Sequence, residues 1–316
     1  MRRIRLAVVL FFFVSCACFA AYYGLEWKNA DRNAPEIEIE EDALVVNVSA
    51  TEEELLEGVT AWDEEDGDLT ARLQIASLSP FVGKNERTVN YIVFDSADRA
   101  ATASRTVLYR DYEPPRIYIK SPLRLGAGEL SNWLGKLNYQ AADVIDGDLT
   151  GKVRLFYTPA DGYVVGEHEI TFQVNNSAGD TCILPVKMTI TDPKEELGKY
   201  YPMLSDYVVY VKAGESLEEE KLPVGMIGNG AEYLFEKVKE SEGTDSAGAG
   251  EDGDGTGADD SERGEQMETS NGIALRDIRV RSYVNYNVPG IYTVEYSYTT
   301  EDDITAVTVL YVVVEE

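Results

Sequence analysis

An internal repeat limits the possible folds of this chain more than any other feature of its sequence. The run Asp-Gly-Asp-Leu-Thr at residues 66–70 returns at residues 146–150, and the run at residues 89–97 is matched at residues 170–178. Both landmarks keep their order and recur about 80 residues apart. Such a spacing indicates a duplicated folding unit of the size of a small domain. The chain is therefore predicted to contain tandem modules.

Each copy alternates apolar and polar residues, which is the pattern of half-buried strands. Val89, Tyr91 and Val93 alternate in the first copy, and Ile170 and Phe172 do so in the second. The strands are short, and Gly, Asp, Asn and Pro turns separate them, without long helical patterns in this part of the chain. These features predict an all-β fold of antiparallel β-sandwiches rather than a βαβ fold.

The C-terminal third repeats only the later half of the plan. Residues 289–298 resemble residues 165–172, and the Asp-Gly-Asp element is missing. An insertion at about residues 240–272 contains 11 acidic residues, eight glycines and one basic residue, Arg263. Because such a stretch buries too little apolar area to offset its ordering entropy, we expect it to be disordered. The predicted modules cover residues 34–111, 112–193 and 200–316, the last a diverged copy.

Short helices are expected at three places in these modules. Residues 51–58 begin with a Ser/Thr cap followed by glutamates, and residues 129–137 are their counterpart in the second copy. Residues 233–239 are the third candidate.

The N-terminus predicts a membrane anchor. Residues 6–25 contain no charged side chain, and 20 helical residues reach across a ~30 Å hydrocarbon layer. Arginines precede the run and acidic residues follow it, so the positive-inside rule places residues 1–5 in the cytoplasm as a stub and the modules outside. A cleaved signal peptide and a lipoprotein modified at Cys16 or Cys18 are the alternatives. All three export the chain.

Composition narrows the functions that the exported part can have. The chain has 57 acidic and 28 basic residues and a net charge of −29, which makes nucleic acid an unsuitable partner. One His and three Cys leave few ways to build a nucleophile with its base or a nitrogen/sulfur metal site. Only Cys182 lies beyond the membrane segment, so the exported part can form no internal disulfide. The chain is therefore expected not to be an enzyme, and no cofactor is expected.

The motifs resemble those of the bacterial immunoglobulin-like surface repeats. Members read Pro-x-Ile, then Gly-Val-x-Ala-x-Asp-x-x-Asp-Gly-Asp-Leu-Thr, then Gly-x-Tyr-x-Val-x-Tyr-x-Val-x-Asp-x-Ala-Gly-Asn, and residues 58–70 and 91–97 follow this pattern. The resemblance covers residues 34–193 well and residues 200–316 only in part. Asp98 departs from it, since it stands where the pattern has Gly. The resemblance implies tandem immunoglobulin-like modules in exported, surface-exposed bacterial proteins, without catalytic residues.

The Asp-Gly-Asp runs are the candidate metal sites. They group hard oxygen ligands of the kind that calcium prefers, although the spacing of an EF-hand is absent. The preferred interpretation is a turn in which Gly takes a positive φ and the Asp side chains accept bonds from nearby N–H groups. The candidate calcium ligands are Asp63, Asp66, Asp68, Asp143, Asp146 and Asp148.

Aromatic residues are the candidate binding groups. Trp62 and Trp133 could stack on sugar rings, but core packing is the preferred interpretation. Tyr283 and Tyr286 are three residues apart and should point to different sides of a strand, which makes them candidates for a binding surface. His168 is expected on an exposed strand position with acidic neighbours.

These observations predict a single-pass bacterial cell-surface protein that acts as a stalk or an adhesion and recognition module. Its partners would be the membrane and a surface protein or glycan. The alternatives are a module that binds carbohydrate or a cell-wall polymer and, last, a hydrolase that uses only carboxylates.

Overall fold

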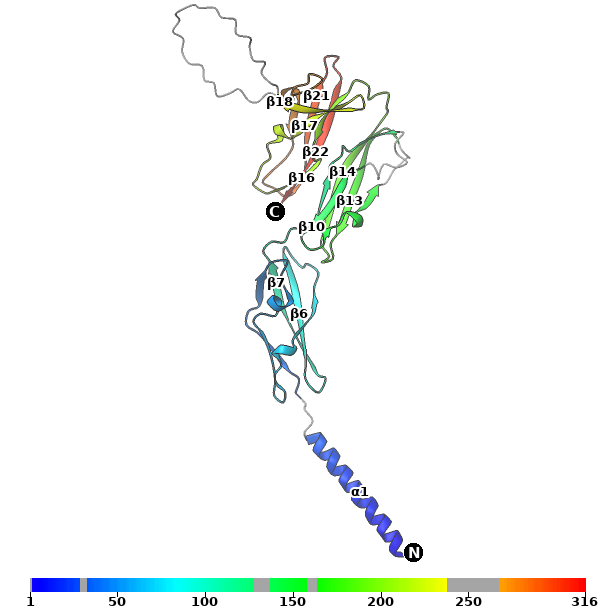
Figure 1. Ribbon diagram of the computed structural model, residues 1–316, viewed down its shortest axis with the longest axis vertical. Helices are drawn as coiled ribbons and strands as arrows, with labels where there is room; N and C mark the ends of the chain where they lie inside the picture. The colour runs from blue at the N-terminus through cyan, green and yellow to red at the C-terminus, as the bar shows by residue number, and fades with distance from the viewer. Residues whose placement is uncertain (1, 29–32, 128–136, 158–163, 238–266) are drawn as a thin grey trace, which may run out of the picture. The chain divides into compact units, whose positions relative to one another are not determined.

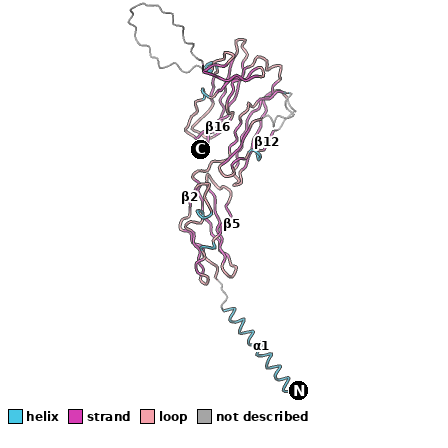
Figure 2. Tube along the Cα trace, viewed as in Figure 1, coloured by secondary structure: helices cyan, strands magenta, loops and turns pink. Residues whose placement is uncertain are grey.

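The computed structural model covers residues 1–316 and describes all of them except residues 1, 29–32, 128–136, 158–163 and 238–266. The side chains of the N-terminal helix are described for residues 8–24. The chain divides into two compact units, Met1–Tyr112 and Glu113–Glu316. Apart from the N-terminal helix, the described part of both units is built mainly from β-strands (Figure 2).

Helix α1, Arg2–Lys28, covers the segment for which a membrane span is predicted (Figure 1). In the described part of the chain, however, no helix has both the length and the apolar character that a membrane crossing requires. The structure therefore confirms a helix over residues 6–25 but does not support the predicted transmembrane span.

The first module is a sandwich of two sheets. One sheet has the order β1-β3-β4, and the other has the order β2-β7-β6-β5. The bounds are β1 Glu36–Ile39, β2 Ala43–Val46, β3 Val59–Asp63, β4 Gly67–Asp68, β5 Gln74–Leu78, β6 Glu86–Phe94 and β7 Ala100–Tyr109. The first strand is split, since β1 pairs antiparallel with β3 while β2 pairs parallel with β7. The alternating residues Val89, Tyr91 and Val93 are buried between the sheets.

The helix predicted at residues 51–58 is confirmed as α2, Glu52–Leu55. Thr51 caps it, since its hydroxyl accepts from the Glu54 N–H at 3.3 Å and the Glu54 carboxylate accepts from the Thr51 N–H at 2.8 Å. Leu55 turns into the core and fixes the helix against the sheets. Nearly all of its predicted counterpart, residues 129–137, lies outside the described residues.

The second module repeats the two-sheet plan of the first. Its sheets have the orders β11-β10-β8 and β12-β13-β14-β9. The bounds are β8 Arg116–Ile119, β9 Arg124–Gly126, β10 Tyr139–Asp143, β11 Gly147–Asp148, β12 Arg154–Tyr157, β13 Gly166–Asn175 and β14 Thr181–Thr191. Its first strand is also split, because β8 pairs antiparallel with β10 and β9 pairs parallel with β14.

The third module keeps this plan in two four-stranded sheets. The orders are β15-β17-β18-β19 and β16-β22-β21-β20, with β16 parallel to β22. The bounds are β15 Tyr200–Leu204, β16 Val208–Lys212, β17 Pro223–Gly228, β18 Ala231–Lys237, β19 Met267–Thr269, β20 Arg279–Ser282, β21 Gly290–Thr299 and β22 Thr305–Glu315.

The helix predicted at residues 233–239 is wrong, because its described residues belong to strand β18. Pairing with β17 on one side and β19 on the other gives this segment its backbone bonds, and Phe235 is buried. The long insertion lies between β18 and β19 in the chain. Residues 238–266 are outside the described residues, whereas Met267–Thr269, near its predicted end, form a strand.

The second and third modules share one core. Their buried apolar residues form a contiguous cluster that includes Ile117 and Leu184 from one module and Tyr207, Val211 and Leu310 from the other. The two modules therefore pack together within the second compact unit.

Candidate functional site

Arg116 connects the second module to the third. Arg116 on β8 donates to both oxygens of Glu315 at the end of β22, at 3.1 Å from Nε and 2.6 Å from Nη2, and Nη1 lies 2.7 Å from Glu113. These hydrogen bonds, led by the one to Glu315, raise the pKa of Arg116 above its ordinary value. A bidentate pair of this kind fixes direction as well as distance.

Tyrosines of the third module cover the edge of strand β8. The Tyr210 hydroxyl accepts from the Ile117 N–H at 2.9 Å and donates to the Ile117 carbonyl at 3.0 Å, while the Tyr207 N–H donates to the Ile119 carbonyl at 2.7 Å. Burial raises the pKa of the Tyr210 hydroxyl above its ordinary value. An edge strand that would otherwise present unpaired groups is thereby closed by its neighbour.

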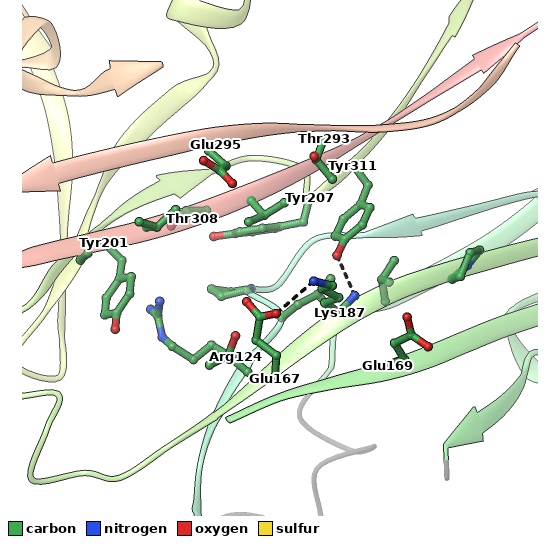
Figure 3. A pocket seen from close by; sticks show the side chains of 18 of the residues that line it. Arg124, Glu167, Glu169, Lys187, Tyr201, Tyr207, Thr293, Glu295, Thr308 and Tyr311 are labelled. Atoms are coloured by element: carbon green, nitrogen blue, oxygen red, sulfur yellow. Dashed lines mark hydrogen bonds and ion pairs between the residues drawn. The ribbon is translucent and has the colours of Figure 1, made fainter. Parts of the chain in front are cut away.

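A cleft of about 730 Å³ opens beside this junction (Figure 3). Its volume lies within the ~300–1,000 Å³ range of small-molecule sites. One wall is the outer face of β13 and β14, and the other is the outer face of β21 and β22. The polar residues on these walls are Glu167, Glu169, Lys187, Thr189, Thr293, Glu295, Thr305, Thr308 and Tyr311.

Lys187 and Tyr311 join the two walls. The Lys187 N–H donates to the Tyr311 hydroxyl at 2.6 Å, and the Lys187 ammonium lies 3.1 Å from a Glu167 oxygen. The hydrogen bond to Glu167 raises the pKa of Lys187, and burial raises the pKa of Tyr311. The ammonium itself is exposed, so it retains N–H donors for a ligand.

Arg124 and Tyr201 lie at another part of the cleft. The Arg124 guanidinium is centred 3.1 Å from the middle of the Tyr201 ring, and it lies 3.7 Å from Glu196. The Tyr201 hydroxyl donates to the same carboxylate at 3.0 Å. Burial raises the pKa of Tyr201 to about 12 and lowers that of Arg124. The arginine is therefore held by packing on the ring as well as by charge.

Charged, polar and apolar side chains all line the cleft. None of the described residues that line it is His, Cys or Ser. The cleft instead combines donors, carboxylate acceptors and apolar side chains such as Pro185, Val307 and Ile291.

The predicted metal ligands of the first module form a turn. Asp63 Oδ1 accepts from the N–H groups of Glu65 and Asp66 at 3.0 and 2.9 Å, and Asp68 accepts from the Thr70 N–H at 2.9 Å. Asp66 accepts from the Ser96 N–H at 2.5 Å, which lowers its pKa. The hydrogen bonds from Thr70 lower the pKa of Asp68.

The second module repeats this turn. Asp143 accepts from the Asp146 N–H at 2.7 Å, Asp146 accepts from Ser177, and Asp148 accepts from the Thr150 N–H at 2.9 Å. Across the described residues, no group of three or more His, Cys, Asp or Glu is arranged to hold a metal ion. Calcium binding by these residues stays a prediction.

The aromatic candidates are distributed differently from the expectation. Trp62 is 57% exposed, so the preferred assignment to the core is wrong: it lies at an outward position of β3. Trp133 is outside the described residues. Tyr283 is 52% exposed, whereas Tyr286 is half-buried and donates to Glu219 at 2.6 Å. Neither tyrosine lines the cleft.

His168 is on strand β13, which confirms the predicted strand position, and its Nε2 lies 2.6 Å from the Val164 carbonyl. The expected exposure is wrong: His168 is half-buried, because it shares a face of the strand with the buried Ile170, and it does not line the cleft.

Sequence reasoning missed the residues that form the cleft. Arg124, Lys187, Glu295 and Tyr311 come from strands that are far apart in the chain, and nothing in their local patterns relates them. The alternation along β13 could have shown that Glu167 and Glu169 face outward, but not what they face.

Comparisons with known proteins identify no family. No protein-family model and no curated protein matches the sequence. Among solved structures, the chain is similar to the CBM51-2 and INT domains of Clostridium perfringens ZmpB in complex with GlcNAc, with 19% identity over 51% of this chain and 40% of that one, and a TM-score of 0.20. This chain spans less than half the length of the ZmpB structures that it matches.

Two further structures cover more of the chain. Drosophila N-cadherin EC1-4 matches with 13% identity over 91% of this chain and 76% of that one, with a TM-score of 0.22. A lipoprotein from Bacteroides thetaiotaomicron matches with 10% identity over 88% and 98%, with a TM-score of 0.19. TM-scores this low carry no argument about function.

Proposed function

We propose that this chain is an exported bacterial surface protein of immunoglobulin-like modules, which acts as a non-catalytic stalk or an adhesion and recognition module. The observation that carries the proposal is the repeated sandwich plan. The same split first strand, with its antiparallel and parallel partners, occurs in all three modules. Repeated modules of this kind supply length and surface rather than one deep catalytic pocket.

The junction of the last two modules supports a mechanical or recognition role. Arg116 and Glu315 form a bidentate pair, and Tyr210 covers the edge of β8. Because the two modules also share a core, they offer a partner a preformed surface with little ordering cost.

Export is supported by the sequence alone. Residues 6–25 carry no charge and follow three arginines, which is the pattern of a segment that directs a chain across a membrane. This segment can stay attached, be cleaved, or carry a lipid. These three alternatives differ in how the modules would be retained at the surface.

Protease treatment of intact cells that express the full chain tests the proposal. The modules should be digested on intact cells to the same extent as after lysis, and detection with an antibody against residues 267–316 would follow their loss. Survival on intact cells, combined with digestion after lysis, would place the modules inside and overturn the proposal. Fractionation of the same cells then separates membrane-attached from released chain.

A further inference from the structure

We propose that the cleft between the second and third modules binds a neutral oligosaccharide. This inference rests on the proposed recognition function and names its ligand class. The volume of about 730 Å³ accommodates a short oligosaccharide rather than a single small ion or a folded domain.

The charges that line the cleft nearly cancel, because Arg124 and Lys187 stand against Glu167, Glu169 and Glu295, a net charge of −1. Lys187 pairs with Glu167 at 3.1 Å and lies directly opposite Glu169 on the neighbouring strand. On the other wall, Glu295 is paired with Arg281 of the neighbouring strand β20. The Tyr283 hydroxyl lies 3.4 Å from a carboxylate oxygen of Glu295. A cleft with a net charge this small exerts little attraction on an ionised ligand, which disfavours a polyanion and gives a polycation only a weak advantage.

Paired charges are nevertheless good partners for hydroxyl groups. A sugar hydroxyl both donates and accepts, so adjacent hydroxyls match an ammonium donor and a carboxylate acceptor that lie side by side. Lys187 and Glu167 form such a pair with exposed side chains. Tyr311 adds a third group, because its oxygen accepts from the Lys187 N–H and, among the described residues, no hydrogen bond uses its own hydrogen.

Apolar side chains lie among these polar groups. Val307 is 43% exposed and Ile291 is 39% exposed on one wall, and Pro185 lies on the other. The C–H faces of sugar rings can pack on such side chains while the hydroxyls reach the charged pairs.

Strand β14 argues against an extended peptide as the occupant. A peptide that extends a sheet needs N–H groups along its edge. Pro185 has no N–H, the Lys187 N–H donates to Tyr311, and the Thr189 N–H donates to the Leu123 carbonyl at 2.9 Å. The outward N–H positions of β14 along the cleft are therefore absent or used.

The experiment titrates the purified full chain by isothermal titration calorimetry. The detergent should be lauryldimethylamine oxide, because a sugar-based detergent would compete. The probes are chitotetraose and cellotetraose, with heptalysine as the peptide arm. The variants are Lys187→Met and Glu167→Gln. Their matched controls are Lys221→Met and Glu218→Gln, an exposed pair at 3.0 Å that does not line the cleft.

We expect at least one oligosaccharide to bind, and both cleft variants to weaken its affinity by about tenfold, since each removes a charge-assisted hydrogen bond. The control variants should bind as the unsubstituted chain does. Thermal melting checks that the cleft variants remain folded, which their exposed side chains favour.

Three results would overturn the inference. These are no binding of either oligosaccharide, binding that the cleft variants leave unchanged, or binding of heptalysine in place of both sugars. The protease experiment is independent of all three. A surface-exposed chain without cleft binding would leave the proposed function standing and remove only this ligand.

Discussion

The first and second modules share one backbone plan but fill two positions of their cores in opposite ways. In the first module, Tyr91 and Arg105 occupy neighbouring strands in the interior, and in the second module Phe172 and Val186 occupy the same positions of the repeat. All four are buried. The repeat therefore fixes where a side chain lies without fixing whether it is polar.

The polar version is a closed network around helix α2. Arg105 donates to the Tyr91 hydroxyl at 3.0 Å, to the Leu55 carbonyl at 2.8 Å and to the Glu57 carbonyl at 2.9 Å. The Tyr91 hydroxyl donates to the Leu55 carbonyl at 2.7 Å. A buried guanidinium thus satisfies carbonyls that the end of a short helix leaves without partners.

The first and second modules also differ in the side chains that contact their Asp-Gly-Asp turns. In the second module, the Asn176 amide donates to Asp143 Oδ2 at 2.8 Å. In the first module, Asp95 replaces this asparagine and Arg99 stands 2.9 Å from it, while Asp63 Oδ2 is buried without a hydrogen-bond partner among the described residues. The same turn is therefore completed by an amide in one copy and by an ion pair in the other.

The largest expected effect is the loss of the buried arginine. Arg105→Met should destabilise the first module by about 3 to 5 kcal/mol, because it leaves buried acceptors unpaired. Hydrogen exchange of peptides from β6 and β7 measures this, with those from β13 and β14 as the internal reference. The double variant Tyr91→Phe with Arg105→Val, which copies the second module, should lose less than the single variant. An equal loss would show that the network contributes only packing.

The next largest effect is expected when the Asp-Gly-Asp turn of the second module is given the acidic residue found in the first. Asn176→Asp should destabilise the second module by about 2 kcal/mol, since it replaces a donor to Asp143 with a carboxylate at a buried position beside it. Urea unfolding followed by exchange of β10 peptides reports it. Asn175→Asp, at the neighbouring exposed position, is the matched control and should change little. Equal effects from both variants would contradict the role of the amide.

The opposite exchange, which gives the first module the residues of the second, should stabilise the first module. Asp95→Asn combined with Arg99→Asp gives the first module the corner of the second, and supplies a donor to the buried Asp63 oxygen. We expect a gain of about 1 kcal/mol in the free energy of unfolding of this module, measured by the same exchange peptides of β3. A loss would mean that the ion pair stabilises the corner better than the amide does.

The smallest expected effect is on acid sensitivity. The pKa of Asp146 is lowered first by the Ser177 hydroxyl bond, with further help from the Ser177 N–H and from Lys152. A carboxyl whose pKa is lower when folded than the ~3.9 of an unfolded chain contributes stability above that pH and loses it as pH falls through the folded pKa.

The melting temperature of Asp146→Asn should therefore lie below that of the unsubstituted chain at pH 6, and the difference should shrink below about pH 4. Asp66→Asn should show a smaller difference, because the charge of Arg72 makes only a minor contribution to the lowered pKa of Asp66, whereas Lys152 lies 3.1 Å from Asp146 and also donates a hydrogen bond to it. A difference for Asp146→Asn that stays constant across this range would contradict the ionic origin of the contribution.

Much of the fold followed from local patterns. The alternation at Val89, Tyr91 and Val93 predicted strand β6, the cap at Thr51 predicted α2, and the repeat predicted the sandwiches of the first two modules. The helix prediction for residues 233–239 is wrong because Leu, Glu and Lys in a short segment suit a helix locally, while the segment's sheet neighbours β17 and β19 come from elsewhere in the chain.

By itself, the sequence determined the repeat, the strand periodicity and the turns, because each depends on residues close together in the chain. Only the tertiary structure decided that Trp62 faces solvent, that Arg105 is buried, and that Lys187 meets Tyr311 across a cleft. Those outcomes depend on which faces of distant strands pack together, and the pattern of one strand shows that it has two faces but not what will cover either of them.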